Sequence, residues 1–567
     1  MVKRRRGRLA VLALAGAGLL ALPVVHAFSD PDPGDGGQDA VEAADAAQRY
    51  AEEPMPLLEL TAAGGKGRLY TLDQEEARKA VADNGMKLEA GRVAYMPREE
   101  FDGSKPMYRL KPSQDSKGWL FTGSADERDQ LLADGWVDEG VGGHLYAEAG
   151  DGMVALKRFS NGEDWRLAPE TRADEFLDAG YKDDGTLGYV YEDWIRAGAV
   201  YFGMFNINGH QRIIERTEEV YGREGDWWGG VRDFYDGHPN GSETWPGEDF
   251  SYLKPSIGYY DDSDPATIEK HIVQATSAGL SFFNFYWYWN SEKREETVTG
   301  AAMDAFLQAG NRNAIDFTVG VCAHPFDGLR IPSDQFGEVS STLVDKYLSQ
   351  ENAMRTNDGR KILNICDARG IGEGEGDPAE IKSFVDTVRA EARDKLGEDV
   401  YVMINQGGFD PNDVPDAGAD ASYCTTDGPA IENGSYEDYL AGQTDFFDAA
   451  PGAYSRCVLS DFDERPRYPI EQTDSEKIRW FDDHTLEGFR QSAANVREDI
   501  DASTRPPEVD NIVYVYAWNE WHEGGAIEPN ARDECAYLEI LAEELRLQSD
   551  SECQLNPSLR GGVADGP

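Results

Sequence analysis

Positive charge is scarce in this sequence of 567 residues: 54 Lys and Arg stand against 106 Asp and Glu, which leaves a formal net charge of −52. So acidic a surface repels phosphate backbones and anionic lipids, which excludes nucleic acid and membrane surfaces as expected partners. Histidine and cysteine are also rare, with eight and six copies, and no two cysteines show the C-x-x-C spacing typical of a zinc site. We therefore expect no metal and no other cofactor.

Long apolar runs are missing after the first 25 residues, so no later segment is expected to span a membrane. The first residues are typical of an export signal. A basic segment (residues 3–8) precedes an apolar stretch (residues 9–25) and a small-x-small cleavage site at Val25-His26-Ala27. We predict a signal peptide over residues 1–27 and a secreted, extracellular, monomeric protein. An uncleaved anchor, which would hold the protein at the cell envelope, is the alternative.

Apolar residues are otherwise sufficient for packed cores, at 40% hydrophobic and 11% aromatic, which excludes a disordered or fibrous protein. The length predicts about two to four domains. Residues 28–60 are predicted to form an acidic flexible linker, and residues 549–567 a C-terminal tail. In an exported protein the six cysteines predict one to three disulfides. We propose Cys424–Cys457 and Cys535–Cys553 because each pair is close in sequence.

Residues 61–196 contain a pattern that occurs three times. Its copies share a triplet (Arg68-Leu69-Tyr70, Trp119-Leu120-Phe121 and Trp165-Arg166-Leu167), then a charged helical stretch, and a closing tyrosine (Tyr95, Tyr146 and Tyr191). One copy is too short to bury its own apolar face, whereas three copies around a pseudo-threefold axis could do so. We predict a small, β-rich, three-repeat domain. It is either a glycan-binding module or a spacer or docking unit whose tryptophans, including Trp136, belong to the core.

Residues 197–548 alternate short apolar strands with amphipathic helical stretches, the pattern of a parallel α/β fold. Eight strands are predicted, at residues 199–205, 282–289, 317–322, 362–366, 400–404, 421–424, 457–460 and 512–517. Eight strands favour a (β/α)8 TIM-like barrel, with a doubly wound sheet as the alternative. In such a barrel the chemistry gathers where the strands end.

The last predicted strand leads into WNEWHEGGAIEP (residues 518–529), which carries Glu520 and Glu523 three residues apart. If this turn is helical, the two side chains point the same way, with Cβ atoms about 5–6 Å apart. Retaining glycosidases hold their two carboxyls roughly 5–5.5 Å apart. Crowded carboxylates push their pKa values apart, so that one serves as acid and the other as base. The flat rings of Trp518 and Trp521 would suit sugar stacking.

WNEWHEGGAIEP resembles the closing motif of glycoside hydrolase family 99, the endo-α-mannosidases and endo-mannanases. It resembles equally the WbsX-like family of bacterial polysaccharide-locus proteins. Further segments resemble these families in the same order, namely PSIGYYD with SDP (residues 255–265), FFNFYWYWN (282–290), DGRKIL (358–363) and DFDERPR (461–467). In the N-terminal part, residues 119–146 resemble a tandem repeat of unknown function found beside bacterial secreted hydrolases.

The resemblance to family 99 implies that Glu520 acts as a base on the 2-hydroxyl of the substrate, which gives a 1,2-anhydro sugar. It implies that Glu523 is the general acid/base and that the stereochemistry is retained. The predicted substrate-binding residues are Tyr259, Tyr260, Trp287, Trp289, His324, Tyr423, Asp463, Arg467, Trp518, Asn519, Trp521, His522 and Glu528.

Two segments depart from these families. After the third predicted strand the families carry a carboxylate, whereas this chain has His324 within VCAHP (residues 321–325). The first strand ends in FNIN (residues 205–208) instead of a Tyr/Trp-rich sequence. Neither change affects the two glutamates. With both changes, however, the sequence does not determine which sugar and which linkage the site would bind.

The leading hypothesis is a secreted glycoside hydrolase that cuts within an α-linked, mannan-like polysaccharide. Export favours a hydrolase over a transferase, because sugar-nucleotide donors are cytoplasmic. The alternatives are a WbsX-like, polysaccharide-processing glycosyltransferase and a non-catalytic glycan-binding protein. The altered loop after the third strand favours the non-catalytic glycan-binding protein.

Overall fold

The structure, a computed structural model, describes residues 51–549 except for 64, 66, 90–91, 98, 115, 117, 151, 163, 193, 207–227, 238–244, 246–247, 298, 326–327, 427–430, 432–433, 470, 472 and 474–477. The predicted signal peptide, most of the predicted linker, and Cys553 with nearly all of the predicted tail lie outside the described residues. Within the described part of the chain, no helix is both long and apolar enough to cross a membrane.

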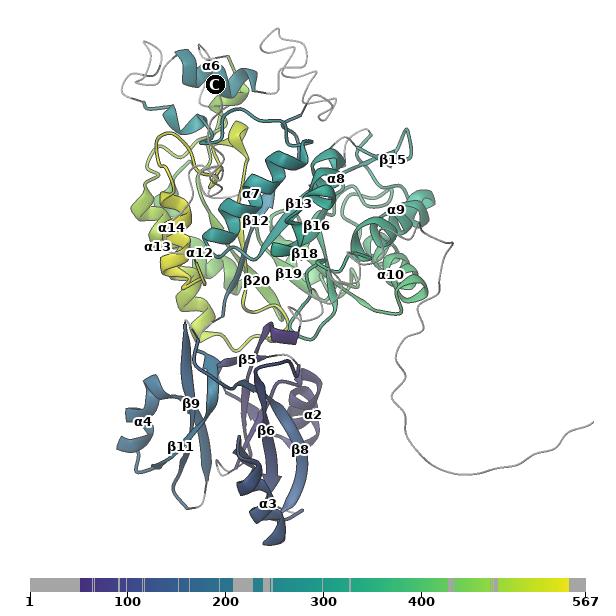
Figure 1. Cartoon of the computed structure of the whole chain (residues 1–567). Coiled ribbons are helices and arrows are strands. Elements are labelled where there is room, and N and C mark those ends of the chain that lie inside the picture. Colours follow the sequence, from purple (N-terminus) through teal and green to yellow (C-terminus); the bar gives the residue numbers. More distant parts are fainter. Residues whose placement is uncertain are drawn as a thin grey trace, which may run out of the picture. The chain divides into compact units, whose positions relative to one another are not determined.

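The N-terminal module is rich in β-strands (Figure 1). Its elements are β1 (Pro54–Pro56), β2 (Leu58–Thr61), β3 (Arg68–Thr71), α2 (Gln74–Asn84), β4 (Lys87–Leu88), β5 (Tyr95–Pro97), β6 (Ser104–Lys111), β7 (Leu120–Thr122), α3 (Ala125–Ala133), β8 (Val137–Tyr146), β9 (Met153–Ser160), β10 (Trp165–Pro169), α4 (Ala173–Asp178) and β11 (Lys182–Tyr191). Two strands, a helix and one or two further strands follow one another three times. The three series begin at β2, β6 and β9.

Equivalent positions of the three copies meet in one core. Tyr70, Phe121 and Leu167, the third residues of the three triplets, are buried in the same hydrophobic cluster. The rings of Tyr70 and Phe121 pack edge to face with centroids 5.6 Å apart, and the Leu167 amide donates to the Tyr70 hydroxyl at 3.1 Å. The closing strands also meet, since Tyr191 pairs with Tyr95. The three segments therefore share one core, although β2, β3 and β4 form a sheet of their own.

The module begins earlier than the predicted boundary at residue 61. Leu57, Leu58 and Leu60, inside the predicted linker, are at most 1% exposed. Their burial needs fixed strands, so residues 54–60 belong to the module. The module's tryptophans are half-buried: the Trp136 and Trp165 rings lie 5.7 Å apart, centroid to centroid.

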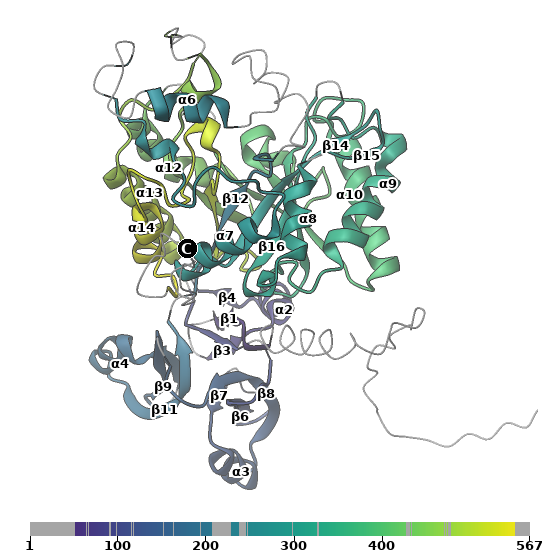
Figure 2. The same ribbon diagram turned by 45° about the horizontal axis from the view of Figure 1, so that its top comes forward.

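Eight parallel strands close into a barrel, with helices outside them (Figures 1 and 2). The strands are β12 (Arg196–Tyr201), β13 (Phe282–Trp287), β16 (Asp316–Cys322), β17 (Lys361–Asp367), β18 (Val400–Asn405), β19 (Ala421–Tyr423), β20 (Tyr454–Leu459) and β21 (Ile512–Tyr516). The sheet closes on itself, because β12, its first strand, pairs with both β13 and the last strand, β21. The predicted (β/α)8 fold is therefore confirmed, and the doubly wound alternative is excluded.

The helices of this part follow the strands along the chain. They are α6 (Gly229–Gly237), α7 (Pro265–Ser277), α8 (Gly300–Gln308), α9 (Phe336–Thr342), α10 (Pro378–Lys395), α12 (Tyr436–Asp448), α13 (Leu486–Ala502) and α14 (Ala536–Glu544). A short hairpin, β14 (Trp289–Asn290) with β15 (Glu295–Glu296), follows β13. The Asp-Pro pair of the SDP motif starts α7: the Asp264 side chain accepts from the Ala266 amide at 3.0 Å, and Pro265 occupies the first helical turn.

Two disulfides join neighbouring strands or their ends. Cys424–Cys457 confirms the predicted pair, and Cys322–Cys366 joins β16 to β17. Cys535 is also disulfide-bonded, but Cys553, its predicted partner, lies outside the described residues.

Candidate active site

Glu520 and Glu523 occupy one tight turn after β21. The backbone from Trp521 to Glu523 forms a 3₁₀ turn, and the Glu523 amide donates to the Glu520 carbonyl at 2.9 Å. In 3₁₀ geometry the side chains at positions i and i+3 eclipse each other. Both carboxyl groups interact with the same cation, Arg467. The predicted helical turn is therefore present, with Glu520 as its N-cap, and the charge of Arg467 acts on both acids.

Glu523 is held on two sides. The Arg467 guanidinium forms an ion pair with one carboxylate oxygen, and the Tyr516 hydroxyl donates to the other. Burial raises the pKa of Glu523, while Arg467 opposes the rise. The side chains of Glu523 and Arg467 are 15% and 31% exposed, so the pair remains accessible from solvent.

Glu520 lies deeper, at 4% exposure. Its Oε2 atom has no hydrogen-bond partner among the described residues. Burial raises the pKa of Glu520 to about 7, although the Arg467 charge acts in the opposite direction. A carboxyl with a pKa near 7 exchanges its proton near neutral pH, as a general acid or base must.

Two tyrosines lie near the two acids, Tyr286 in β13 and Tyr288 directly after it. Burial raises the pKa values of Tyr286 and Tyr288, and the charges of Glu520 and Glu523 raise them further. The Tyr286 hydroxyl lies 3.5 Å from the Thr425 Oγ1 atom, after β19. Both tyrosines are half-buried, so their rings and hydroxyls line the space beside the two acids.

A histidine–aspartate pair borders this space. The His324 Nδ1 atom lies 2.6 Å from Asp367 Oδ2, and the Tyr288 and His324 rings lie 5.6 Å apart. Burial alone would raise the pKa of Asp367, but hydrogen bonds from His324 and Arg369 lower it to about 2. Asp367 ends β17, the strand next to β16. A carboxylate from this neighbouring strand therefore lies beside His324.

A buried chain of polar side chains supports the turn from behind. The Tyr260 hydroxyl donates to Glu528 Oε2 at 2.8 Å, and His271 Nε2 lies 3.4 Å from Glu528 Oε1. The Trp521 indole donates to the Tyr260 hydroxyl at 3.2 Å. Glu528 and His271 are 0% exposed. Glu528 therefore positions the turn and does not contact substrate in this conformation.

Three further predicted residues also fix the backbone. The Asn519 side chain bonds to both the amide (2.8 Å) and the carbonyl (3.0 Å) of Phe202, which ties the turn to the end of β12. The His522 ring stacks on Phe205. Asp463 accepts from the Tyr252 hydroxyl at 2.6 Å and pairs with Arg465 at 2.8 Å. These side chains are buried and hold the loops that carry the two acids.

Five aromatic residues predicted to bind substrate belong to the core instead. Their exposed fractions are 0% for Trp287, Trp518, Trp521 and Tyr423 and 3% for Trp289. No sugar can stack on rings that neighbouring side chains cover. From the end of β13 to the start of β14, burial alternates, so that Tyr286 and Tyr288 are half-buried and the two tryptophans are buried. Tyr259 is half-buried, and its ring lies 4.6 Å from the Lys254 ammonium.

Of the predicted site residues, the structure thus brings Glu520, Glu523, Arg467 and His324 together. Tyr286, Tyr516 and Asp367 complete the site and were missed. The position of Asp367 at a strand end could have identified it, whereas the aromatic run around Tyr286 gives no alternation to read. No sequence signal marks Tyr516. Among the described residues, no group of three or more His, Cys, Asp and Glu side chains could hold a metal ion.

The fold and the site together define a (β/α)8 barrel with paired carboxyls at the C-terminal ends of its strands. Residues 431–541 match the family described as Glycosyltransferase WbsX, and residues 56–191 match a domain of unknown function, DUF5648. The first match contains β20, β21 and the turn with both glutamates, which confirms the predicted resemblance to the WbsX-like family there. The second confirms that the N-terminal module resembles a domain of unknown function.

Several solved structures resemble the barrel at low identity. A glycoside hydrolase-like protein is 16% identical, with 62% of this chain and 94% of that chain covered and a TM-score of 0.39. The GH99 endo-alpha-mannosidase from Bacteroides thetaiotaomicron is 16% identical, with 62% and 97% covered and a TM-score of 0.37. An endo-1,4-beta-mannanase from Rhizomucor miehei is 11% identical, with 50% and 91% covered and a TM-score of 0.33. With scores this low, the fold rests on the strand pairing of this chain itself. No curated protein matches the chain.

Proposed function

We propose that the protein is a secreted, retaining glycoside hydrolase that cuts within α-linked, mannan-like polysaccharide. One observation carries the proposal: two acids with raised pKa values lie one 3₁₀ turn apart, interact with one arginine and sit at the C-terminal end of the barrel. Export rests on the predicted signal segment, residues 1–27.

In the first step, the Glu520 carboxylate takes the proton of the sugar 2-hydroxyl, and the freed oxygen attacks the anomeric carbon. The glycosidic bond breaks as its oxygen takes the proton of Glu523, so the products are a 1,2-anhydro sugar and a shortened chain. A pKa of about 7 makes Glu520 a stronger base than an ordinary carboxylate. Burial raises the pKa of Glu523 and favours the protonated acid of this step, whereas the ion pair with Arg467 favours the carboxylate that acts in the second step.

In the second step, water opens the 1,2-anhydro ring. Glu523 takes a proton from the water, the hydroxide adds to the anomeric carbon, and Glu520 returns its proton to the sugar 2-oxygen. Two inversions at the anomeric carbon amount to net retention. The Arg467 charge stabilises whichever carboxyl is ionised at each stage.

A glycosyltransferase is the second candidate, because the family that matches residues 431–541 carries that description. Such an enzyme would need a nucleotide-sugar donor. The donor phosphates would have to enter a protein with a net charge of −52, and the catalytic space offers Arg467 beside two carboxyls. Calorimetry with GDP-mannose and UDP-glucose distinguishes the two candidates, since the hydrolase binds neither.

The test is digestion of α-mannans and bacterial surface glycans by the mature protein, with product size measured by mass spectrometry. We expect oligosaccharide products from wild type and a loss of at least about 100-fold in rate for Glu520→Gln and for Glu523→Gln. Glu487→Gln serves as the matched control, because the Glu487 side chain is 87% exposed on α13. Unchanged rates in both active-site variants would contradict the proposal.

A further inference from the structure

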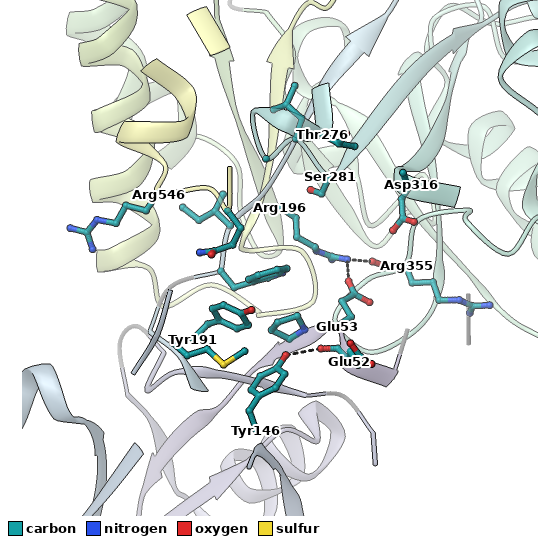
Figure 3. A pocket seen from close by; sticks show the side chains of 18 of the residues that line it. Glu52, Glu53, Tyr146, Tyr191, Arg196, Thr276, Ser281, Asp316, Arg355 and Arg546 are labelled. Atoms are coloured by element: carbon teal, nitrogen blue, oxygen red, sulfur yellow. Dashed lines mark hydrogen bonds and ion pairs between the residues drawn. The ribbon is translucent and has the colours of Figure 1, made fainter. Parts of the chain in front are cut away.

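A cavity of about 600 Å³ lies where the N-terminal module meets the barrel (Figure 3). Its barrel side is formed where strands begin: Arg196 opens β12, Ser281 directly precedes β13, and Asp316 opens β16. The two glutamates instead follow the C-terminal end of β21. Strands of this length span about 20 Å, so the cavity is separate from the catalytic space.

The module contributes an aromatic wall to this cavity. Phe101, Tyr146, Tyr191 and Trp194 line it, and all four are half-buried. The Tyr146 and Tyr191 centroids lie 5.6 Å apart, and those of Tyr191 and Trp194 lie 4.8 Å apart. The Tyr146 hydroxyl donates to the Glu52 carbonyl at 2.9 Å, which fixes its ring (Figure 3). Tyr146 and Tyr191 are two of the three tyrosines that close the repeats.

Charged groups of both signs complete the lining. They are Glu52, Glu53, Asp316, Glu351, Arg196, Arg355 and Arg546. Arg196 is 3% exposed and binds Glu53 at 2.6 Å and the Arg355 carbonyl at 2.8 Å (Figure 3). The buried indole N–H of Trp194 and the Nε of Arg196 have no hydrogen-bond partner among the described residues. The cavity therefore offers donors, acceptors and apolar faces together.

We propose that this cavity binds a neutral oligosaccharide. A sugar ring presents apolar C–H faces, which suit tyrosine and tryptophan, and a rim of hydroxyls, which bind carboxylates and guanidinium groups. A purely apolar ligand would desolvate the carboxylates and guanidinium groups that line the cavity, at a cost in free energy. Four carboxylates against three arginines disfavour an anion. The volume lies within the roughly 300–1,000 Å³ typical of small-molecule sites.

The site gives the module a role in holding polysaccharide. The exposed residues Glu351 and Arg546 mark the cavity rim, through which a sugar chain can enter. The sugar site stands whether or not the barrel hydrolyses glycans. The further step, that the bound chain belongs to the polymer that the barrel cleaves, rests on the proposed function.

The test uses the full mature chain carrying Glu520→Gln and Glu523→Gln, so that no ligand is consumed. Calorimetry with α-mannotetraose, maltotetraose and cellotetraose measures affinity and the number of sites per chain. We expect at least one tetrasaccharide to bind at a site that Trp194→Ala weakens about tenfold or more, which corresponds to about 1.4 kcal/mol. Trp136→Ala is the matched control, because Trp136 is half-buried in the same module but does not line the cavity.

A second variant covers the case in which Trp194→Ala does not fold. Ala314 is exposed and lines the cavity, so Ala314→Trp fills the space without removing a contact. We expect this variant to fold and to lose the same site. If no tetrasaccharide binds, or if binding is insensitive to both variants, the cavity is only a gap between two packed parts and the proposal is overturned. Binding at this site in a protein without hydrolase activity would refute the proposed function alone.

Discussion

Glu520→Gln is expected to stabilise the barrel above neutral pH, although it removes a candidate catalytic group. The pKa of Glu520 is about 7 in the folded protein, against an ordinary value of 4.5. The folded state therefore binds this proton more tightly than the unfolded state, and stability falls as the pH rises from 4.5 to 7. At about 1.36 kcal/mol per pKa unit, the ionised side chain costs about 3 kcal/mol above pH 8. Glutamine has the same shape and no such cost.

The assay is thermal unfolding of wild type and variant at pH 5 and pH 8.5. At about 2.1 cal/mol/K per residue, a barrel of about 350 residues unfolds with an entropy of about 0.7 kcal/mol/K, so 3 kcal/mol raises its Tm by about 4 °C at pH 8.5. At pH 5 the folded carboxyl is protonated while the unfolded one is mostly ionised, so the difference should shrink to about 1 kcal/mol, or about 1 °C in Tm. Glu487→Gln, at an 87% exposed side chain, should change neither value. A Glu520→Gln barrel that is no more stable at pH 8.5, or equally stabilised at both pH values, would refute the reasoning.

Three further changes test other parts of the account. Arg467→Met removes the charge that lowers the pKa values of both acids, so the acidic limb of the pH–rate profile should move up by about one pH unit. An unchanged acidic limb would contradict the interaction of Arg467 with both glutamates. Asp367→Asn weakens the acceptor of His324 and should raise KM about tenfold with kcat nearly unchanged; steady-state kinetics would expose a loss in kcat instead. Replacing Cys424 and Cys457 by Ala opens a loop of 33 residues and should cost about 4 kcal/mol in urea unfolding; an unchanged midpoint argues against the disulfide.

The barrel was predictable because parallel strands are buried on both faces and therefore appear as short apolar runs. The eight predicted strands overlap β12, β13 and β16 to β21, with ends that differ by a few residues. The first prediction began three residues late, since Arg196 is buried in spite of its charge and continues the strand. The ion pair with Glu53 compensates the charge of this arginine, and a contact so distant in sequence leaves no local pattern.

The side-chain direction in FFNFYWYWN was not predictable. Every residue but two is aromatic, so hydrophobic alternation cannot indicate which face is inward. The structure turns Trp287 and Trp289 into the core and Tyr286 and Tyr288 toward the site. The tyrosine hydroxyls need polar surroundings, whereas the larger indole rings fill the space between strands and helices.

The acidic pair was found because its two members lie in one short motif. The residues around it are brought together by strand order: Asp367 comes from β17, Arg467 from the loop after β20 and Tyr516 from β21. Only closure of the barrel makes these strand ends neighbours. Distance along the chain also hid Cys322–Cys366, which spans 44 residues, whereas Cys424–Cys457 spans 33.

The most direct test of the account is the crystal structure of Glu523→Gln with a glycan that wild type cleaves. The account predicts the glycosidic oxygen within about 2.6–3.2 Å of the residue-523 side chain and the sugar 2-hydroxyl equally close to Glu520. A glycan that binds in the barrel mouth with its 2-hydroxyl away from Glu520, or that leaves this turn untouched, would contradict the assignment of these two residues to the chemistry.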